Sequence, residues 1–192
     1  MKYDIIVAGV GGQGTLSVSS IIASAAMSEG LSVKQSEVHG MSQRGGAVVT
    51  NLRLSDKPIA SDLIAHGSAS MILSMEPLEG LRYLPYLSPD GTLISSTNPV
   101  VNIPDYPDLD ALLQSIRELP HSVVVDGEEI ARRSGSIRAT NMVMVGAASE
   151  LLPVRPETIE RFIQESFGGK GERVVDANIK AFRAGREAAN IV

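Results

Sequence analysis

The chain has 192 residues, of which 43% are hydrophobic and 20% charged, so it is long and apolar enough for one globular domain over 1–192 and is not a disordered chain. The net charge of -5 argues against nucleic acid or an anionic membrane as the main partner. There is no cysteine, which excludes a disulfide, a cysteine-ligated iron–sulfur cluster and a thiol nucleophile. No apolar run reaches membrane-spanning length and no signal peptide is recognised, so we expect a cytoplasmic protein.

The first predicted strand, Tyr3 to Ala8, runs directly into a glycine-rich turn and then into a helix from about Gly12 to Glu29. This order places backbone N–H groups and a helix N-terminus where they can hold an anionic group such as phosphate. Close packing of helix on strand is the alternative explanation for such glycines. The candidate ligand-binding turn consists of Gly9, Gly11, Gly12, Gln13 and Gly14.

The next two predicted strands, Leu31 to Val38 and Ala47 to Leu54, lie close together in the sequence. Only eight residues, His39 to Gly46, separate them. A crossover helix needs about a dozen residues or more, so we predict a mixed sheet with a direct loop. Glu37 stands where a Rossmann fold keeps the acid that binds a ribose, although the short connection is not that of a standard dinucleotide domain.

Strands and helices alternate over the rest of the chain. We expect a hairpin turn at 55–58, a turn at 88–91, and a helical C-terminal part. The predicted strands are 69–74, 92–96 and 121–125, and the predicted helices are 76–87, 109–119, 128–133, 140–151, 156–167 and 172–189. The fold class is therefore α/β, with a mixed Rossmann-like sheet flanked by helices.

The loop from His39 to Gly46 is the most unusual segment. It places polar side chains between two strand ends beside the glycine turn, and loops in this position are favoured ligand sites. An ordinary exposed loop is the alternative. Arg44 suits a two-pronged contact with a phosphate or a carboxylate. The candidate loop residues are His39, Met41, Ser42, Gln43, Arg44, Gly45 and Gly46.

The glycine turn followed by the run Glu37-Val38-His39-Gly40-Met41-Ser42-Gln43-Arg44-Gly45-Gly46 resembles the gamma-type subunit of 2-oxoacid:ferredoxin oxidoreductases. Within that family the sequence is most similar to the beta subunit of indolepyruvate ferredoxin oxidoreductase. A later segment, Arg138-Ala139-Thr140-Asn141 with Gly146-Ala147, is similar to another motif of the family, which makes Arg138 and Asn141 secondary candidates. The resemblance covers residues 2–152.

The resemblance implies a division of labour. The family oxidatively decarboxylates a 2-oxoacid, here an aryl pyruvate such as indolepyruvate, and forms an acyl-coenzyme A. Thiamine diphosphate, magnesium and the iron–sulfur clusters that reduce ferredoxin would reside on a larger partner subunit. The present chain would shape the active site at the subunit interface and could contact coenzyme A. We expect no metal site on this chain and inactivity in its isolated form.

Two other functions stay open at the level of sequence. The chain could be a stand-alone nucleotide- or flavin-binding protein that uses the glycine turn and Glu37. It could also be a regulatory module with a vestigial glycine turn. A homodimer of the isolated chain is possible on either view.

Overall fold

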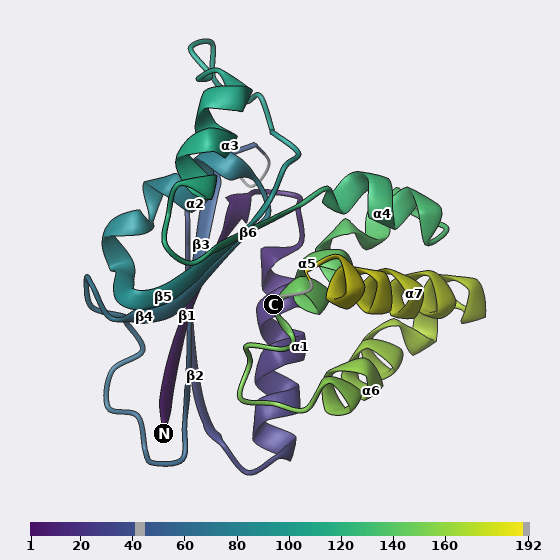
Figure 1. Ribbon diagram of the computed structural model, residues 1–192. Helices are drawn as coiled ribbons and strands as arrows, with labels where there is room; N and C mark the ends of the chain where they lie inside the picture. The colour runs from purple at the N-terminus through teal and green to yellow at the C-terminus, as the bar shows by residue number, and fades with distance from the viewer. Residues whose placement is uncertain (41–44, 190–192) are drawn as a thin grey trace.

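The computed structural model describes residues 1–40 and 45–189, and a six-stranded mixed sheet forms its centre (Figure 1). The strands are β1 (Lys2–Val10), β2 (Ser32–His39), β3 (Ala47–Ser55), β4 (Ala69–Ser74), β5 (Leu87–Ser96) and β6 (Ser122–Val125). Their spatial order is β2-β3-β1-β4-β5-β6. Strand β3 is antiparallel to both β1 and β2, whereas β1, β4, β5 and β6 are parallel. The predicted mixed sheet is confirmed.

Helices cover both faces of this sheet (Figure 1). The short helices α2 (Pro77–Arg82) and α3 (Leu109–Arg117) lie on one face. The other face carries a thicker helical layer, which confirms the predicted helical C-terminal part. This layer consists of α1 (Thr15–Ser28), α4 (Gly127–Arg133), α5 (Thr140–Ala148), α6 (Pro156–Phe167) and α7 (Glu172–Ala188).

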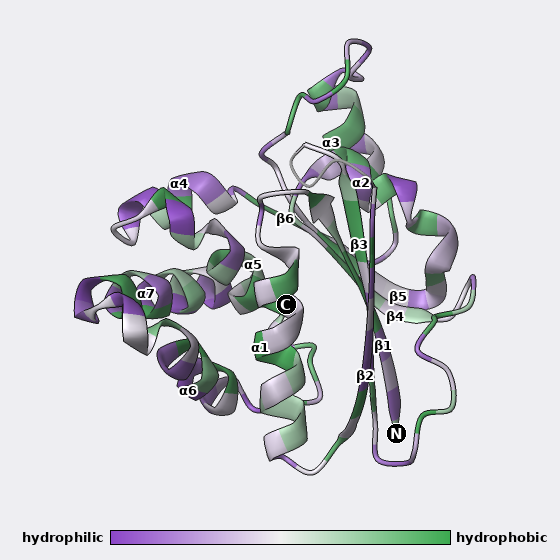
Figure 2. Ribbon diagram, turned by 180° about the vertical axis from the view of Figure 1, so that it is seen from behind, coloured by the Kyte–Doolittle hydropathy of each residue, from purple (hydrophilic) through white to green (hydrophobic). Residues whose placement is uncertain are grey.

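Two hydrophobic cores follow from the alternation of side chains along the strands. Ile5 and Val7 of β1 belong to the core beneath α1 and α5, whereas Ile6 and Ala8 belong to the core beneath α2 and α3. Figure 2 shows largely hydrophobic central strands, a more hydrophilic β2, and a mixture of hydrophobic and hydrophilic residues on α6 and α7. Burying both faces of β1 explains why its sequence is a continuous apolar run rather than an alternating one.

Helices α5 and α7 cross at two glycines. A Cβ atom on Gly146 would lie 2.0 Å from the carbonyl oxygen of Phe182, and one on Gly185 would lie 2.1 Å from the carbonyl oxygen of Val143. The two backbones therefore approach as closely as they do only because neither position has a side chain. This contact fixes α7 to the rest of the helical layer.

Some predicted boundaries were wrong, for reasons visible in the backbone. Helix α1 begins at Thr15 instead of Gly12, because Gly12 and Gly14 have φ angles of +108° and +81°, which no right-handed helix contains. Helix α2 ends at Arg82 instead of Leu87. Pro85 cannot donate the backbone hydrogen bond that a continuing helix needs, and a short 3₁₀ helix, η1 (Leu84–Tyr86), takes its place.

Two predicted turns also differ. No hairpin follows Ser55, since the described chain has no strand between Ser55 and Ala69. Arg53 Nη1 instead donates to the carbonyls of Ser61 and Leu63, both at 2.9 Å, and so fastens this segment as a loop over the sheet. Residues 88–91 lie within β5, where the pairing with β4 shifts register. The predicted turn is therefore a local irregularity within β5, and the strand continues through it.

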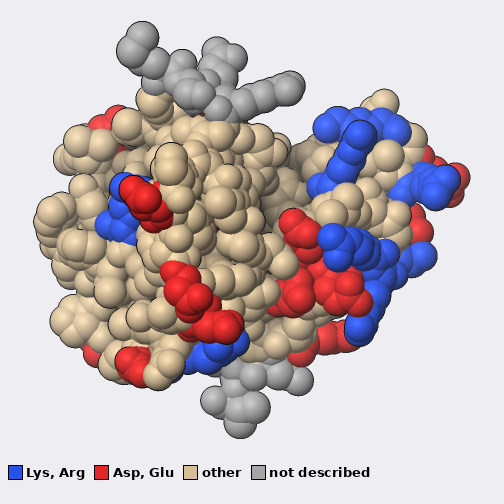
Figure 3. All heavy atoms as spheres, turned by 90° about the horizontal axis from the view of Figure 1, so that it is seen from above, with Lys and Arg blue, Asp and Glu red and all other residues tan. Residues whose placement is uncertain are grey.

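Charged side chains concentrate on the helical side of the molecule. Seen from above, basic and acidic groups lie next to each other on the lobe that contains α4 (Figure 3). On α4 the pairs are Arg132 with Glu128 at 3.0 Å and Arg133 with Glu129 at 2.8 Å, both between residues four apart. No helix within the described residues combines the length and apolar character that crossing a membrane requires.

Candidate functional site

The glycine turn lies at the carboxyl end of β1 and is held by its own glutamine. Gln13 Oε1 accepts a hydrogen bond from the N–H of Val10 at 2.8 Å, and Gln13 Nε2 donates to the carbonyl of Met75 at 3.1 Å. The side chain of Gln13 therefore joins the turn to the end of β4. Gly9 is packed against the same residues, since a Cβ there would lie 3.0 Å from Gln13 Oε1 and 3.1 Å from Met75 Cβ.

The C-terminal end of the loop between β2 and β3 meets this turn directly. Gly11 N–H donates to the carbonyl of Gly46 at 2.8 Å, and Gly45 N–H donates to the carbonyl of Gly11 at 3.2 Å. The structure thus places the predicted turn and the predicted loop side by side. The candidates Met41, Ser42, Gln43 and Arg44 lie outside the described residues.

A cavity of about 340 Å³ opens between the turn and the loop. Gly11, Gly12 and Gly14 line it together with His39 and Glu37, whose Oε2 accepts a hydrogen bond from Thr50 Oγ1 at 3.3 Å. Leu16 also lines the cavity and is 52% exposed, so it brings an exposed apolar side chain to it. In the described part of the chain, no side-chain group caps the N-terminus of α1, which begins beside this cavity.

The secondary motif touches the glycine turn through Asn141. The Nδ2 atom of Asn141 lies 2.7 Å from the position that a Cβ on Gly14 would occupy. A side chain at position 14 is therefore disfavoured twice, because φ is positive there and because it would collide with the amide of Asn141. Asn141 Oδ1 is buried and has no hydrogen-bond partner in the part of the chain that the structure describes. Arg138, in the 3₁₀ helix η2 (Ile137–Ala139), lines a neighbouring cavity with Asn141.

Sequence reasoning missed the part played by the loop between β5 and α3. Asn102 Nδ2 donates to the carbonyl of Gly45 at 2.7 Å, and Tyr106 Oη donates to Glu76 Oε2 at 2.7 Å. Burial, together with the hydrogen bond and charge of Glu76, raises the pKa of Tyr106. The loop is thereby fixed to both α2 and the β2–β3 loop. Val101, in the outer part of this loop, is 71% exposed. An apolar residue in a proline-rich loop was the one feature of the sequence that could have indicated a contact surface here.

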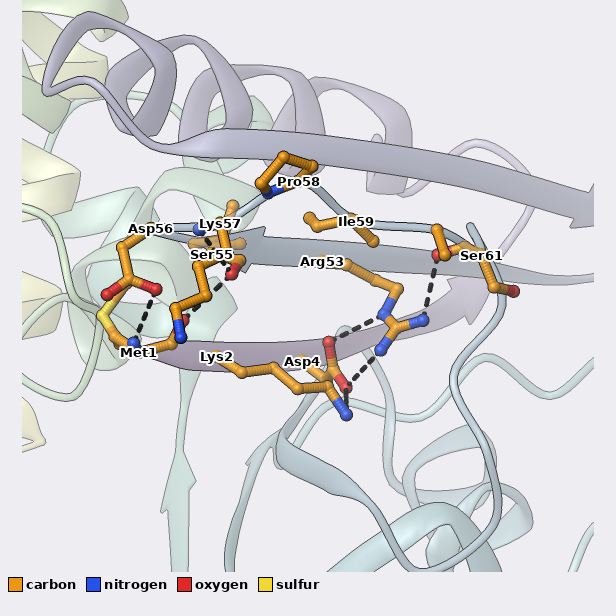
Figure 4. A pocket seen from close by; sticks show the side chains of 12 residues that line it. Met1, Lys2, Asp4, Arg53, Ser55, Asp56, Lys57, Pro58, Ile59 and Ser61 are labelled. Atoms are coloured by element: carbon orange, nitrogen blue, oxygen red, sulfur yellow. Dashed lines mark hydrogen bonds and ion pairs between the residues drawn. The ribbon is translucent and has the colours of Figure 1, made fainter.

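A different cavity, of about 530 Å³, lies at the start of β1 (Figure 4). Two carboxylates hold most of its charged groups: Arg53 Nε and Nη2 donate to the two oxygens of Asp4 at 2.9 and 3.1 Å, and Lys2 Nζ lies 2.9 Å from Asp4 Oδ2. The N-terminal ammonium lies 2.6 Å from Asp56, and the exposed Lys57 also lines the cavity. We assign the contacts of Asp4 and Asp56 to the attachment of the loop after β3.

The chain matches the model of the pyruvate ferredoxin/flavodoxin oxidoreductase family over residues 4–188. It is 38% identical to "Indolepyruvate oxidoreductase subunit IorB" of Archaeoglobus fulgidus, with 98% of this chain and 96% of that one covered. It is 40% identical to the IorB subunit of Methanothermobacter thermautotrophicus, with 98% of each covered.

A solved structure, the 2-oxoglutarate:ferredoxin oxidoreductase of Magnetococcus marinus with 2-oxoglutarate, coenzyme A and succinyl-CoA bound, shares the fold. The TM-score is 0.78 at 24% identity, and the match covers 100% of this chain but 31% of that longer one. The family match and the near full-length identity to two subunits confirm the resemblance stated above: the chain belongs to the pyruvate ferredoxin/flavodoxin oxidoreductase family and is an oxidoreductase subunit of its gamma type.

Proposed function

We propose that this chain is the smaller subunit of an indolepyruvate:ferredoxin oxidoreductase. The observation that carries the proposal is the 38–40% identity to two IorB subunits over nearly the whole length of both partners. The complex would convert an aryl pyruvate into an acyl-coenzyme A and reduce ferredoxin. Thiamine diphosphate, magnesium and iron–sulfur clusters on the larger subunit would supply the decarboxylation and the electron transfer.

The rim of the glycine-turn cavity is the surface we assign to the larger subunit. Leu16, Val38 and Val101 are exposed apolar residues from three separate segments of the chain. Leu16 lines the cavity, and the loop that carries Val101 is bonded to Gly45 beside it. Val38 lies at the same end of β2, on the opposite face from the lining residues Glu37 and His39. Apolar side chains with a polar surround are typical of a protein–protein contact. Docking there would close the cavity and exclude water from it.

The same cavity suits part of coenzyme A. Gly12 and Gly14 have no side chains to block a ligand. Helix α1 begins there, and its N-terminus has no side-chain cap. The N–H groups of Gly11 and Gln13 bond within the protein, which leaves the helix N-terminus as the polar contact that the turn offers. We therefore assign to this chain the binding and orientation of coenzyme A, and no chemical step.

Co-expression with a larger subunit that carries thiamine diphosphate and clusters tests the proposal. The assay is dye or ferredoxin reduction with indolepyruvate and coenzyme A. We expect activity only when both chains are present, and lower activity with pyruvate or 2-oxoglutarate. Full activity of the larger chain alone, or failure of the two chains to associate, would refute the subunit assignment.

Arg44 is tested in the same complex. From its sequence position we expect Arg44→Ala to raise the KM for coenzyme A or indolepyruvate about tenfold or more, as the loss of a charged hydrogen bond does. Arg132→Ala, on the exposed face of α4, is the matched control and should behave as the unaltered complex. Equal kinetics for both variants would remove Arg44 from the site.

A further inference from the structure

The loop between β5 and α3, residues 97–108, joins two segments that lie far from it in the sequence. Asn102 Nδ2 donates to the carbonyl of Gly45, 57 residues away, and Tyr106 Oη donates to Glu76 Oε2, 30 residues away, both at 2.7 Å. Three prolines stand in the loop, and each fixes its own φ angle. The two contacts therefore act on a segment whose backbone freedom is already restricted.

The contact of Tyr106 is made with a buried carboxyl group. Glu76 follows β4 and is 1% exposed. Its Oε1 accepts from the N–H of Glu79 in the first turn of α2, and its Oε2 accepts from Tyr106. In the part of the chain that the structure describes, no basic group lies within 4.0 Å of Glu76. Because a buried carboxylate oxygen needs a hydrogen-bond donor, the Tyr106 hydroxyl is a required partner and holds the loop in place.

The segment that carries Glu76 also holds the glycine turn. Met75, the preceding residue, accepts at its carbonyl from Gln13 Nε2 at 3.1 Å. The N–H of Met75 donates to the carbonyl of Ala8 at 2.8 Å. One short piece of backbone after β4 is therefore bonded to the end of β1, to the glutamine of the glycine turn and, through the next side chain, to the β5–α3 loop.

The contact of Asn102 reaches the same turn by a different route. Gly45 accepts from Asn102 at its carbonyl, and its N–H donates to the carbonyl of Gly11 at 3.2 Å. The contacts thus close on themselves: they lead from Gly11 through Gly45 to the β5–α3 loop, from the loop to residues 75–76, and from there back to the glycine turn. We call this arrangement the contact ring.

We propose that Asn102 and Tyr106 are positioning residues for the glycine turn. Tyr106 acts through Glu76, and Asn102 acts through Gly45. This inference rests on the proposed function, in which the turn binds a ligand at the contact with the larger subunit. The contact ring holds the turn in its binding shape before the ligand arrives, which lowers the cost of ordering the site on binding. Neither side chain needs to touch the ligand.

Hydrogen–deuterium exchange of the isolated full chain tests the contact ring without a ligand. Tyr106→Phe removes one oxygen atom, and the amides of Gly11 and Gly45 should then exchange about tenfold faster, while those at the centre of β1 are unchanged. Tyr86→Phe is the matched control, since it removes the same atom from a half-buried tyrosine outside the contact ring. Equal exchange in the two variants, or faster exchange throughout the chain, would overturn the proposal.

A conservative change at Glu76 separates the contact from the charge. In Glu76→Gln the side-chain oxygen can still accept from Glu79 N–H, and the new amide can donate to Tyr106 Oη. We therefore expect normal exchange in Glu76→Gln and fast exchange once Tyr106→Phe is added. Fast exchange in Glu76→Gln alone would show that the charge of Glu76 holds the turn, and would overturn the role of the loop.

The two positioning residues should also depend on each other, although they do not touch the same atoms. Opening the contact ring at one point lessens the effect of opening it at the second, so Asn102→Ala/Tyr106→Phe should accelerate exchange by less than the product of the two single effects. Multiplication of the two effects would mean that Asn102 and Tyr106 act independently, which contradicts the contact ring.

Kinetics of the reconstituted complex separate this proposal from the proposed function. We expect Tyr106→Phe to raise the KM for coenzyme A about threefold to tenfold with little change in kcat, and Tyr86→Phe to leave both unchanged. Unchanged KM in Tyr106→Phe refutes the positioning role and leaves the subunit assignment intact. An unaltered complex that is inactive with every 2-oxoacid refutes the subunit assignment, and the exchange measurements then decide on the contact ring.

Discussion

Two cavities have similar volumes: the cavity at the start of β1, of about 530 Å³, and a cavity between η2, the 3₁₀ helix η3 (Gly168–Lys170) and α7, of about 580 Å³. The second is lined by Arg138, Lys170 and Arg173, and we call it the cationic cavity. Both contain several charged side chains. They differ in how those charges are arranged. In the first, Asp4 is 1% exposed and receives both Arg53 and Lys2, while Asp56 receives the N-terminus (Figure 4). In the second, three cations face the cavity without a carboxylate among the lining residues. Size alone would treat the two cavities as equals.

The comparison teaches that a buried carboxylate partner, more than volume, marks a cavity whose charges hold segments together. A buried ion pair with further hydrogen bonds joins two segments, and its loss is costly because the remaining charge stays buried. Like charges that face a cavity without a carboxylate repel one another and join nothing. Changes in the first cavity should therefore lower stability more than changes in the second.

Asp4→Ala should have the largest effect on stability. It leaves the guanidinium of Arg53, whose side chain is 12% exposed, without its two-pronged partner. We expect the free energy of unfolding to fall by about 3–5 kcal/mol, measured by urea denaturation. Asp56→Ala, at a pair whose side chains are 37% and 50% exposed, is the control and should cost less than about 1 kcal/mol. Similar losses in the two variants would contradict the distinction between buried and exposed pairs.

Gly185→Ala should have the second-largest effect on stability. The added methyl group would overlap the carbonyl of Val143, so α5 and α7 must separate, and we expect a loss of about 3 kcal/mol. Gly168→Ala is the matched control, because nothing lies within 4 Å of its Cβ position and its backbone is helical. A thermal melt of Gly185→Ala that resembles that of Gly168→Ala would show that the crossing tolerates separation.

The sequence was sufficient for the sheet and for the neighbourhood of the glycine turn. The continuous apolar run of β1 and the short link between β2 and β3 dictate a buried central strand and an antiparallel neighbour, and both occur. The glycine turn and the loop had to meet, because both follow strand ends at one edge of the sheet. The hydrogen bonds between Gly11 and Gly46 show that contact.

The cationic cavity could not be predicted from the sequence. Arg138 lies in η2, Lys170 in η3 and Arg173 in α7, so their convergence depends on how α7 packs back onto α5. That packing depends on Gly146 and Gly185, which periodicity does not single out because helix interiors contain such glycines without crossing another helix. Asn178 likewise had no signal, since an asparagine in an amphipathic helix is usually exposed.

Asn178→Leu sharpens the comparison by measuring the cost of a buried polar group that carries no charge. Leucine removes a buried unpartnered oxygen and is the better helix former, so we expect the free energy of unfolding to rise by about 1 kcal/mol. A calorimetric melt measures the effect. A less stable variant would mean that the bond from Asn178 Nδ2 to the carbonyl of Val174, at 2.8 Å, outweighs the cost of the unpartnered oxygen.

The smallest effect on stability should come from changing Glu29, which pairs with Arg155 on the outside of the helical layer. Burial tends to raise the pKa of Glu29, but hydrogen bonds from Thr158 and Arg155 and the charge of Arg155 outweigh it and lower the pKa. A carboxyl group whose pKa is lower in the folded than in the unfolded chain stabilises the fold fully above its unfolded pKa, about 4.3, and progressively loses this effect as the pH falls through the folded pKa. Glu29→Gln should therefore lower stability by less than about 1 kcal/mol at pH 7. The difference between the two proteins, measured by urea denaturation, should shrink over the pH interval from about 4.3 down through the lowered pKa of the folded chain. A difference that stays constant over that interval would show that the Arg155 contact, at 3.0 Å, contributes through hydrogen-bond geometry and not through charge.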